Sequence, residues 1–331
     1  MAVSVPSTLA GFGDLVSEDI QKIFVQRRMA SEGGLGMDKV YNVSTSASYY
    51  NKDSSMIGTD TANFIGDNSS VVYDGLLQGY DKTYTTKKFG KGLKISDHLW
   101  RRGIEFRKIT GIVDSLNDSL DDKIEKDAFD PLNNGYSTSY VDDDSQTVST
   151  AGGDAVAFFS ASHTREDGGT NWNNVVYDGT TYNMDFEYDA LKALRRTASL
   201  VLNGRGQQTM FMPDTLVAKY GSTVQSRYEE MQAAISRNMI PGGNENDGAA
   251  KVGLPKLIVT KYLDNDAYWF AFDSSFKKDE YGLQWIWCEK PHLLEPELDY
   301  DTQLYKRQAL MWYDRGANNM RNFYGSEGDN N

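Results

Sequence analysis

Ser160 and His163 are the residues of this chain whose types and spacing come nearest to a nucleophile and its general base. A catalytic serine of that kind sits in a sharp glycine-containing turn, and its histidine is oriented by a carboxylate. The sequence shows no such turn, and no aspartate is placed to orient His163. The pattern therefore predicts a structural histidine, packed or hydrogen-bonded where a short strand ends.

Metal and thiol chemistry are limited by composition. The chain has one cysteine, Cys288, and three widely separated histidines, His98, His163 and His292. A single cysteine excludes an internal disulfide framework and a multi-cysteine zinc site, and the spread of the histidines makes a histidine-based metal centre a poor interpretation. We therefore expect no enzyme and assign no catalytic, cofactor-binding or metal-binding residue.

Carboxylates are so abundant that choosing two as a glycosidase pair would be arbitrary. Four of them fall late in a predicted long helix, where we interpret them as a solvated face: Asp121, Asp122, Glu125 and Asp127. Residues 142–144 and 264–266 are acidic, but they lack the central glycine and terminal glutamate of a calcium loop. Residues 204–206 lack the Lys-Ser/Thr of a phosphate loop. We interpret all three segments as ordinary loops.

Aromatic side chains gather in the second half of the chain and could line a ligand groove. Packing between strands is the interpretation that we favour, because such side chains carry much of the apolar area of a core. The cluster comprises Trp269, Phe270, Phe272, Trp285, Trp287 and Trp312.

The overall composition is typical of a protein that folds but is not a dedicated nucleic-acid-binding protein. A length of 331 residues suggests about two domains. The 47 acidic residues outnumber the 34 basic ones, for a net charge of −13, whereas dedicated DNA- or RNA-binding proteins present a basic field. The longest purely apolar run, Ala155–Phe159, is too short to span a bilayer, and residues 1–6 show no secretory signal. We expect a soluble protein made in a reducing compartment.

Charge is divided unevenly along the first half of the chain. Residues 80–110 carry nine basic and three acidic residues, a net +6, and residues 111–154 carry two basic and eleven acidic residues, a net −9. A basic segment beside an acidic one favours head-to-tail contact between copies, although each side could also simply be solvated. The candidates for contact between subunits are Lys82, Lys87, Lys88, Lys91, Lys94, Arg101, Arg102, Asp121, Asp122, Glu125 and Asp127.

The local patterns predict a mixed α+β protein that opens with one short amphipathic helix near residues 20–28. Strand-like runs at residues 39–50 and 80–95 suggest a long polar two-stranded ribbon, which is marginal alone in water and needs an outside surface. An apolar stripe with helical spacing follows from Asp97 to about Phe129, where Pro131 should stop the helix.

The second half alternates less regularly, as in α+β proteins. We expect a short buried strand at residues 157–163, helices at 186–202 and 224–235, and strands at 209–213, 256–262, 268–273 and 283–288. Two further strands, from 303 to 316 and after it, should be joined by a turn within one sheet.

This order of elements resembles the major capsid proteins of tailed bacteriophages. Asn133-Asn134-Gly135-Tyr136 and then Phe158-Phe159-Ser160-Ala161-Ser162-His163 resemble the asparagine and F-S-x-x-H pattern of the Mu-like major head subunit branch. The run from Thr209 to Leu216 resembles that branch's strand-Pro-helix junction. The closing segment, from Glu289 to Gly316, resembles the part of those proteins that returns to the peripheral domain.

The resemblance implies a capsid-protein fold with five regions. These are an N-terminal arm (1–40), an extended β-hairpin loop (41–96), a peripheral domain with a spine helix (97–185), an axial domain (186–288), and return strands with a C-terminal tail (289–331). It also implies hexamers and pentamers in an icosahedral head, with the extended loop lying over the neighbouring subunit.

The same resemblance implies a virion protein assembled in the host cytoplasm, without cofactors and without a membrane. Its implied partners are further copies of itself, a separate scaffolding protein, a portal, decoration proteins, and packaged double-stranded DNA held by weak non-specific contact. An acidic wall fits such a container, since it grips DNA little. Two other functions stay open at this point: a carbohydrate-binding or hydrolytic protein, and another lattice-forming protein of a tail or surface layer.

Overall fold

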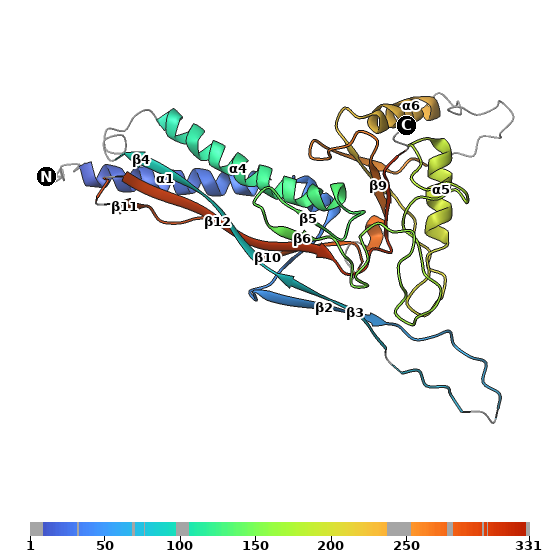
Figure 1. Cartoon of the computed structure of the whole chain (residues 1–331). Coiled ribbons are helices and arrows are strands. Elements are labelled where there is room, and N and C mark those ends of the chain that lie inside the picture. Colours follow the sequence, from blue (N-terminus) through green and yellow to red (C-terminus); the bar gives the residue numbers. More distant parts are fainter. Residues whose placement is uncertain are drawn as a thin grey trace.

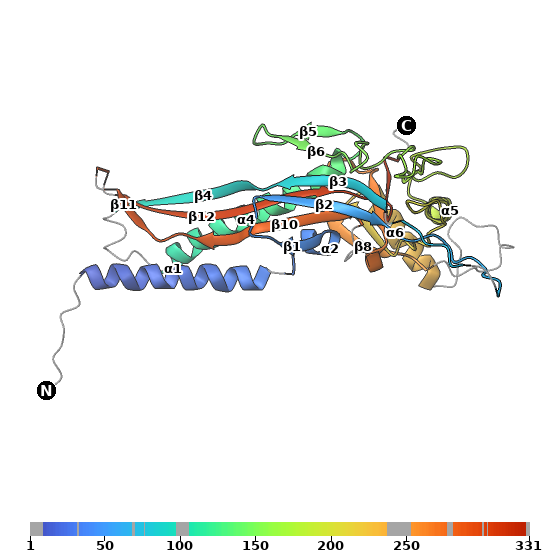
Figure 2. The same ribbon diagram turned by 90° about the horizontal axis from the view of Figure 1, so that it is seen from below.

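The computed structural model describes residues 9–31, 33–67, 70–75, 77–96, 106–236, 253–276, 281–299, 301–302 and 304–328. The molecule is elongated (Figures 1 and 2). A long sheet flanked by two helices forms one end, a compact unit with its own sheet and helices forms the other, and a two-stranded ribbon projects past the compact unit. Among the described residues, no helix is both long enough and apolar enough to cross a bilayer.

The long sheet has five strands, and its central strand binds the rest together. The strands are β1 (Asn42–Thr45), β4 (Lys87–Ser96), β10 (Leu283–Leu293), β11 (Glu297–Asp299) and β12 (Leu304–Ala317). Strand β12 pairs antiparallel with β10, β11 and β4, and β1 pairs in parallel with β10. Side chains along β12 alternate between buried and more exposed positions, as expected for a sheet with one covered face. The pairing of β10 with β12 shifts register on both sides of Glu289, close to Pro291, which cannot donate a ladder hydrogen bond.

Helix α4 (Phe106–Asn133) covers this sheet and confirms the predicted apolar stripe. Its buried positions recur every three or four residues and include Val113, Leu116, Leu120 and Ile124. The predicted stop at Pro131 is wrong, because the helix runs through Pro131 to Asn133. A proline so near the last turn removes only one N–H, and Asn134 N–H still donates to the Asp130 carbonyl at 3.1 Å. The predicted start at residue 97 lies outside the described residues.

Helix α1 (Leu9–Ser31) is much longer than the short helix predicted near residues 20–28. It packs along α4 and reaches β10, and its buried residues Ile20 and Phe24 join the same core as the α4 stripe. A five-residue helix, α2 (Gly36–Val40), follows and also packs on α4. Helices α1 and α2 therefore pack on the folded body of the molecule.

The compact unit is built on a four-stranded sheet of order β13-β9-β7-β8. Its elements are α5 (Tyr188–Ser199), β7 (Thr215–Lys219), α6 (Thr223–Ser236), β8 (Lys256–Thr260), β9 (Trp269–Phe272), the 3-10 turn η1 (Ser274–Phe276) and β13 (Phe323–Ser326). The two predicted helices, and the strands at β8 and β9, are confirmed. The core holds the aromatic strand β9, every residue of which is buried.

Three strand predictions here are wrong. Residues 209–213 form no strand, since the strand begins at Thr215, beyond Pro213. Residues 157–163 bury Phe158 and Phe159 but form only isolated bridges. Strand β13 does not return to the sheet of β12 but pairs with β9. The strand predicted at residues 283–288 is confirmed as part of β10, which pairs with β12 in the long sheet. Strand partners that lie far apart in sequence are not fixed by local patterns.

The ribbon consists of β2 (Tyr50–Ile57) and β3 (Leu77–Thr85), paired from Tyr50–Thr85 to Ile57–Leu77. This is shorter than the single hairpin predicted over residues 41–96, because β1 and β4 leave the ribbon and join the long sheet. A second small hairpin, β5 (Ser139–Val141) with β6 (Thr147–Ser149), lies beside the long sheet.

Candidate assembly surfaces

The base of the ribbon is fixed to the body of the molecule. Lys82, predicted as a candidate for contact between subunits, is half-buried, and its Nζ donates to the Ala151 carbonyl at 2.6 Å. Burial lowers the pKa of Lys82. Next to it Tyr84 is only 1% exposed, and the Thr85 N–H donates to Asp314 Oδ2 at 2.6 Å. Lys82 therefore anchors the ribbon within its own chain.

The far end of the ribbon opens into a loop whose two legs are held by one arginine. Arg205, in a turn of the compact unit, donates from Nε to the Gly58 carbonyl and from Nη2 to the Gly75 carbonyl, the latter at 2.8 Å. The neighbouring Gln207 donates to Asp60 Oδ1 at 3.0 Å. The pKa of Asp60 is lowered, first by the hydrogen bond from the Thr61 N–H and then by Gln207. The turn thus sets the direction in which the loop leaves the molecule.

Beyond that clamp the loop exposes large apolar side chains. Phe64 is 97% exposed and Tyr73 is 88% exposed, and Ile65, Val71 and Val72 are also exposed. A monomeric protein rarely leaves so many large apolar groups together in water, so a cluster of this kind marks a contact surface. We did not identify Arg205 or these loop residues from the sequence. The usable signal was the pair of apolar runs, 64–65 and 71–73, inside an otherwise polar stretch.

Four of the predicted basic residues lie on β4 rather than on the ribbon. Lys88, Lys91 and Lys94 are exposed and Lys87 is half-buried. Within the described part of the chain β4 pairs only with β12, so it is an edge strand. Lysines on an edge strand oppose unwanted strand pairing and leave a positive stripe on the surface. The other two candidates, Arg101 and Arg102, lie outside the described residues.

Of the four acidic residues that we predicted to form a solvated face of α4, Asp122 is exposed, whereas Asp121 and Glu125 are half-buried and Asp127 is buried. Asp121 pairs with Arg28 of α1, and Asp122 lies 3.1 Å from Lys261 Nζ. Glu125 accepts the Met37 N–H of α2 at 3.3 Å, and burial raises its pKa. These carboxylates fasten neighbouring elements to α4, which the periodicity of the helix alone does not reveal.

Asp127 is fully buried and ties α4 to β12. Its Oδ2 accepts the Tyr313 hydroxyl at 2.6 Å and lies 3.1 Å from Arg315 Nη1, and its Oδ1 lies 3.0 Å from Lys123 Nζ. A buried carboxylate is tolerated when cations and hydrogen-bond donors surround it in this way. With no exposed surface, Asp127 carries no part of the contacts proposed below.

His163 is a buried structural residue, as predicted, although the sequence interpretation missed its carboxylate partner. Its Nδ1 lies 2.8 Å from Asp154 Oδ2, its Nε2 lies 3.1 Å from Asn174 Oδ1, and its ring stacks on Trp172 at 4.2 Å. The Oγ of Ser160 accepts the Ser162 N–H. Both ring nitrogens of His163 are thus engaged away from the serine. The described residues also contain no cluster of three or more histidine, cysteine or acidic side chains arranged to hold a metal ion.

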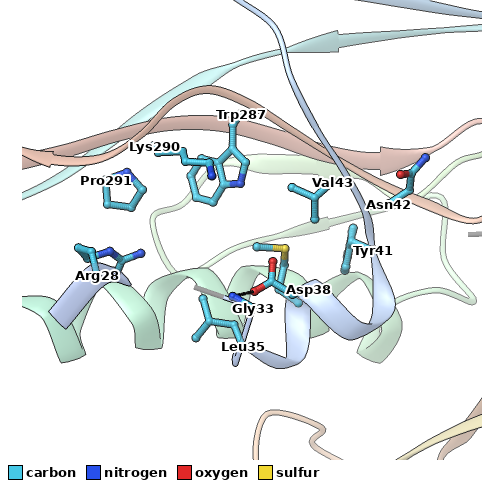
Figure 3. Close-up of a pocket in the computed structure, with 11 residues that line it drawn as sticks. Arg28, Gly33, Leu35, Asp38, Tyr41, Asn42, Val43, Trp287, Lys290 and Pro291 are labelled. Carbon is cyan, nitrogen blue, oxygen red and sulfur yellow. Dashed lines mark hydrogen bonds between the residues drawn. The ribbon is translucent and has the colours of Figure 1, made fainter. Parts of the chain in front are cut away.

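A crevice of about 480 Å³ lies between the α1–α2 connection and strands β1 and β10 (Figure 3). Trp287 and Lys290 of β10 form one wall, and Leu35 and Asp38 form the opposite wall. Asp38 Oδ2 accepts the Gly33 N–H at 3.0 Å, which closes the turn before α2. The lining combines apolar and charged groups, and it contains no nucleophile and base in contact.

The aromatic cluster is mainly core, as predicted. Trp269, Phe270, Phe272, Trp285 and Trp287 are all buried. The sixth member, Trp312, is half-buried near the lysine stripe, where Tyr49 packs against it and Lys88 Nζ lies 5.4 Å from its ring centroid. Core packing is therefore the main role of these residues, and Trp287 also borders the crevice of Figure 3.

Together, the projecting ribbon with its apolar loop, the long helix α4 and the separate compact unit define an elongated molecule with a large exposed apolar surface on the loop. The family model described as "Phage capsid protein" matches residues 79–317, and the chain belongs to that family. The expectation of a phage capsid protein is thereby confirmed, and the Mu-like branch stays a prediction. No curated protein matches the sequence.

Solved structures agree on the fold. The chain is similar to one titled "Microbacterium phage Oxtober96", with a TM-score of 0.52 and 9% identity, covering 89% of this chain and 91% of that one. One titled "Mycobacterium phage Adephagia" gives a TM-score of 0.51 and 9% identity over 90% and 91%. A third, titled "Capsid structure of the Cyanophage P-SCSP1u", gives a TM-score of 0.51 and 10% identity, covering 88% of this chain and 87% of that one. The predicted capsid-protein fold is confirmed.

Proposed function

We propose that this chain is the structural shell subunit of a tailed-phage head, without catalytic activity, and that it assembles into hexamers and pentamers around double-stranded DNA. The observation that carries the proposal is the ribbon. The ribbon has two polar strands, and its loop exposes large apolar side chains to water. The ribbon is anchored to its own chain at its base and by Arg205, but the apolar tip of its loop has no cover. The tip gains stability on another surface, and in a shell that surface is the neighbouring subunit.

Charge supports two parts of the proposal, the weak hold on DNA and the contact between copies. The net charge of −13 keeps the attraction for packaged DNA weak and non-specific. The exposed Lys88, Lys91 and Lys94 of β4, the lysine stripe, are a candidate docking surface for acidic residues of an adjacent copy. Contacts of this heterologous kind build rings and lattices. A separate scaffolding protein, a portal and decoration proteins are the proposed partners, and the virion, assembled in the host cytoplasm, is the proposed location.

Removing the ribbon loop tests the proposal. Because one guanidinium bonds both the Gly58 and the Gly75 carbonyls, the two legs are close enough for a short Asn-Gly turn to replace residues 59–74. We expect the unmodified chain to form closed shells in electron micrographs. The deletion variant should stay a folded subunit, with an unchanged circular dichroism spectrum and cooperative melting, but should form no shells.

The control shortens a different hairpin, by replacing residues 142–145 between β5 and β6 with the same turn, and its melting temperature measures the effect of losing the Asp144–Lys123 ion pair. This control should still assemble. Tubes or flat sheets from the unmodified chain would contradict the proposed head subunit. Shells from the ribbon-loop deletion would contradict the role of the ribbon loop as the contact on which assembly depends.

A further inference from the structure

Strand β4 leaves one edge of the long sheet without a partner. It is ten residues long and pairs with β12 over its whole length. Within the part of the chain that the structure describes, no strand pairs with its other side, and β4 lies along the rim of the sheet (Figure 2). Every second residue of such a strand directs its backbone N–H and C=O groups away from the sheet. The edge therefore offers a row of donors and acceptors long enough for an extended peptide.

Charge decides which strand can use this edge. Strand β4 carries Lys87, Lys88, Lys91 and Lys94 and no acidic residue, and three of the four lysines are exposed. Lysines on an edge strand deter chance pairing with other strands. Opposite charges directly across two strands stabilise the pair, whereas like charges destabilise it. The edge is therefore suited to an acidic strand.

Two glycines leave room for the side chains of such a strand. Side chains alternate between the two faces of a strand, so Gly90 and Gly92 lie in the same row as Lys88 and Lys94 and between them. The half-buried Leu310 of β12 lies against Gly90, where a Cβ would come within 2.5 Å of its Cδ2. Glycines on an edge are covered well by large apolar side chains of a neighbouring strand. The fitting strand has two acidic residues six positions apart, with apolar residues at the alternate positions between them.

None of the strands that the structure describes in this chain fits that pattern. A second copy of β4 would set lysines against lysines. The edge strands β1 and β8 contain no aspartate or glutamate, and β2 and β3 each have one aspartate beside one lysine. Strand β11 is acidic, but it has only three residues, and its Asp299 is paired with Lys306. The acidic strand must therefore come from a different protein.

We infer that β4 binds an extended acidic segment of a different protein, which adds to the long sheet as a further strand. Backbone hydrogen bonds supply the affinity, and the lysines and the gap at Gly90 and Gly92 supply the choice of sequence. The inference goes beyond the proposed function and stands whether or not the chain builds a shell. In a shell, the added strand and an adjacent copy would compete for the same lysines.

Fluorescence anisotropy with a labelled synthetic peptide tests the added strand on the full-length, unassembled chain. The peptide Ser-Glu-Thr-Val-Thr-Val-Thr-Glu-Ser sets its glutamates opposite Lys88 and Lys94, and its valines opposite Gly90 and Gly92, in either strand direction. A second peptide of the same sequence has every amide between the glutamates N-methylated, so it keeps the charge but cannot donate hydrogen bonds to β4. A short single strand of DNA provides a polyanion of another class.

We expect the unmodified peptide to bind about tenfold more tightly than the N-methylated peptide or the DNA, because only it can complete the backbone pairing. Lys88→Glu with Lys94→Glu should weaken its binding about tenfold. The control, Lys22→Glu with Lys39→Glu, changes the net charge equally at exposed lysines elsewhere and should bind as the unmodified chain does. In the complex, deuterium exchange should slow in β4 and stay unchanged in β7.

Failure of the peptide to bind would overturn the inference, and so would equal binding of the N-methylated peptide, since charge alone would then account for it. DNA that binds as tightly as the peptide would show a general polyanion site instead. Equal weakening by the two double variants would place the peptide away from β4. If the β4 variant does not melt cooperatively, the exchange measurement on the unmodified chain decides. Each contrary result leaves the proposed head subunit intact.

Discussion

At the scale of single residues, buried charged side chains connect more of the elements of this chain than its composition suggests. Asp127 lies between Lys123, Tyr313 and Arg315, and Arg321 forms a buried pair with Glu166 at 2.6 Å. Breaking such a pair leaves an uncompensated buried charge and costs about 3–5 kcal/mol. The sequence identifies these side chains only as part of an acidic helix and a strand, because their partners are far away in the chain.

Asp130 provides the first residue-scale prediction. Burial, and then the charge of Asp127, raise its pKa to about 6 from the usual 3.8. The folded state therefore binds this proton more tightly than the unfolded state does, so the ionised carboxylate costs stability above pH 6, and the cost disappears as the pH falls toward 4. After allowance for solvent screening of a partly exposed group, we expect Asp130→Asn to raise the free energy of unfolding at pH 8 by about 1 kcal/mol.

Thermal or urea unfolding at pH 8 and at pH 4 measures this difference, which should be absent at pH 4. Asp143 is the control, because Lys126 lowers its pKa, so Asp143→Asn should give no gain at pH 8. Equal stabilisation by Asp130→Asn at both pH values would show that its cause is not the proton.

At the scale of elements, local patterns predicted helices well and strand partners poorly. The stripe of Val113, Leu116, Leu120 and Ile124 gives α4 from sequence alone, because helical spacing is a local property. The local sequence of the lysine-rich strand β4 does not specify its pairing partner, and that partner, β12, lies more than two hundred residues later. The prediction of the assembly surfaces was limited for the same reason. The sequence shows the lysines of β4, but it does not show that they lie in the long sheet rather than on the ribbon.

The clamp on the ribbon loop gives a prediction for an element. Arg205→Ala removes hydrogen bonds to the carbonyls of both legs, so the loop should open more often than in the unmodified chain. We expect the amide of Asp60, which donates to Asp74 Oδ2 at 2.7 Å, to exchange about fivefold to tenfold faster in deuterium-exchange measurements. Exchange in the buried strand β7 should not change.

Arg205→Lys is the informative companion, because a lysine keeps the charge but presents no planar fork that spans two carbonyls. It should give exchange close to that of the alanine variant. Unchanged exchange in Arg205→Ala would mean that the legs are held by the β2–β3 pairing alone.

At the scale of the whole molecule, the same chain must repel and attract its copies. A net charge of −13 on every subunit is repulsive, and it is opposed by the apolar loop and by the positive stripe of β4. Repulsion spread over the surface and attraction confined to a stripe respond differently to mutation. Altering the stripe should therefore slow assembly more than the same charge change elsewhere.

Lys91→Glu with Lys94→Glu alters the stripe, and Lys22→Glu with Lys39→Glu alters exposed lysines outside it, and each pair takes the net charge from −13 to −17. We expect the stripe variant to assemble about tenfold more slowly than the control variant at low ionic strength, by light scattering, with the gap closing near 1 M salt where charges are screened beyond about 3 Å. If both variants slow equally, net charge alone governs assembly and β4 is no docking surface for an adjacent copy. If the stripe variant lags by the same factor at high salt, the lysines act through packing rather than through their charge.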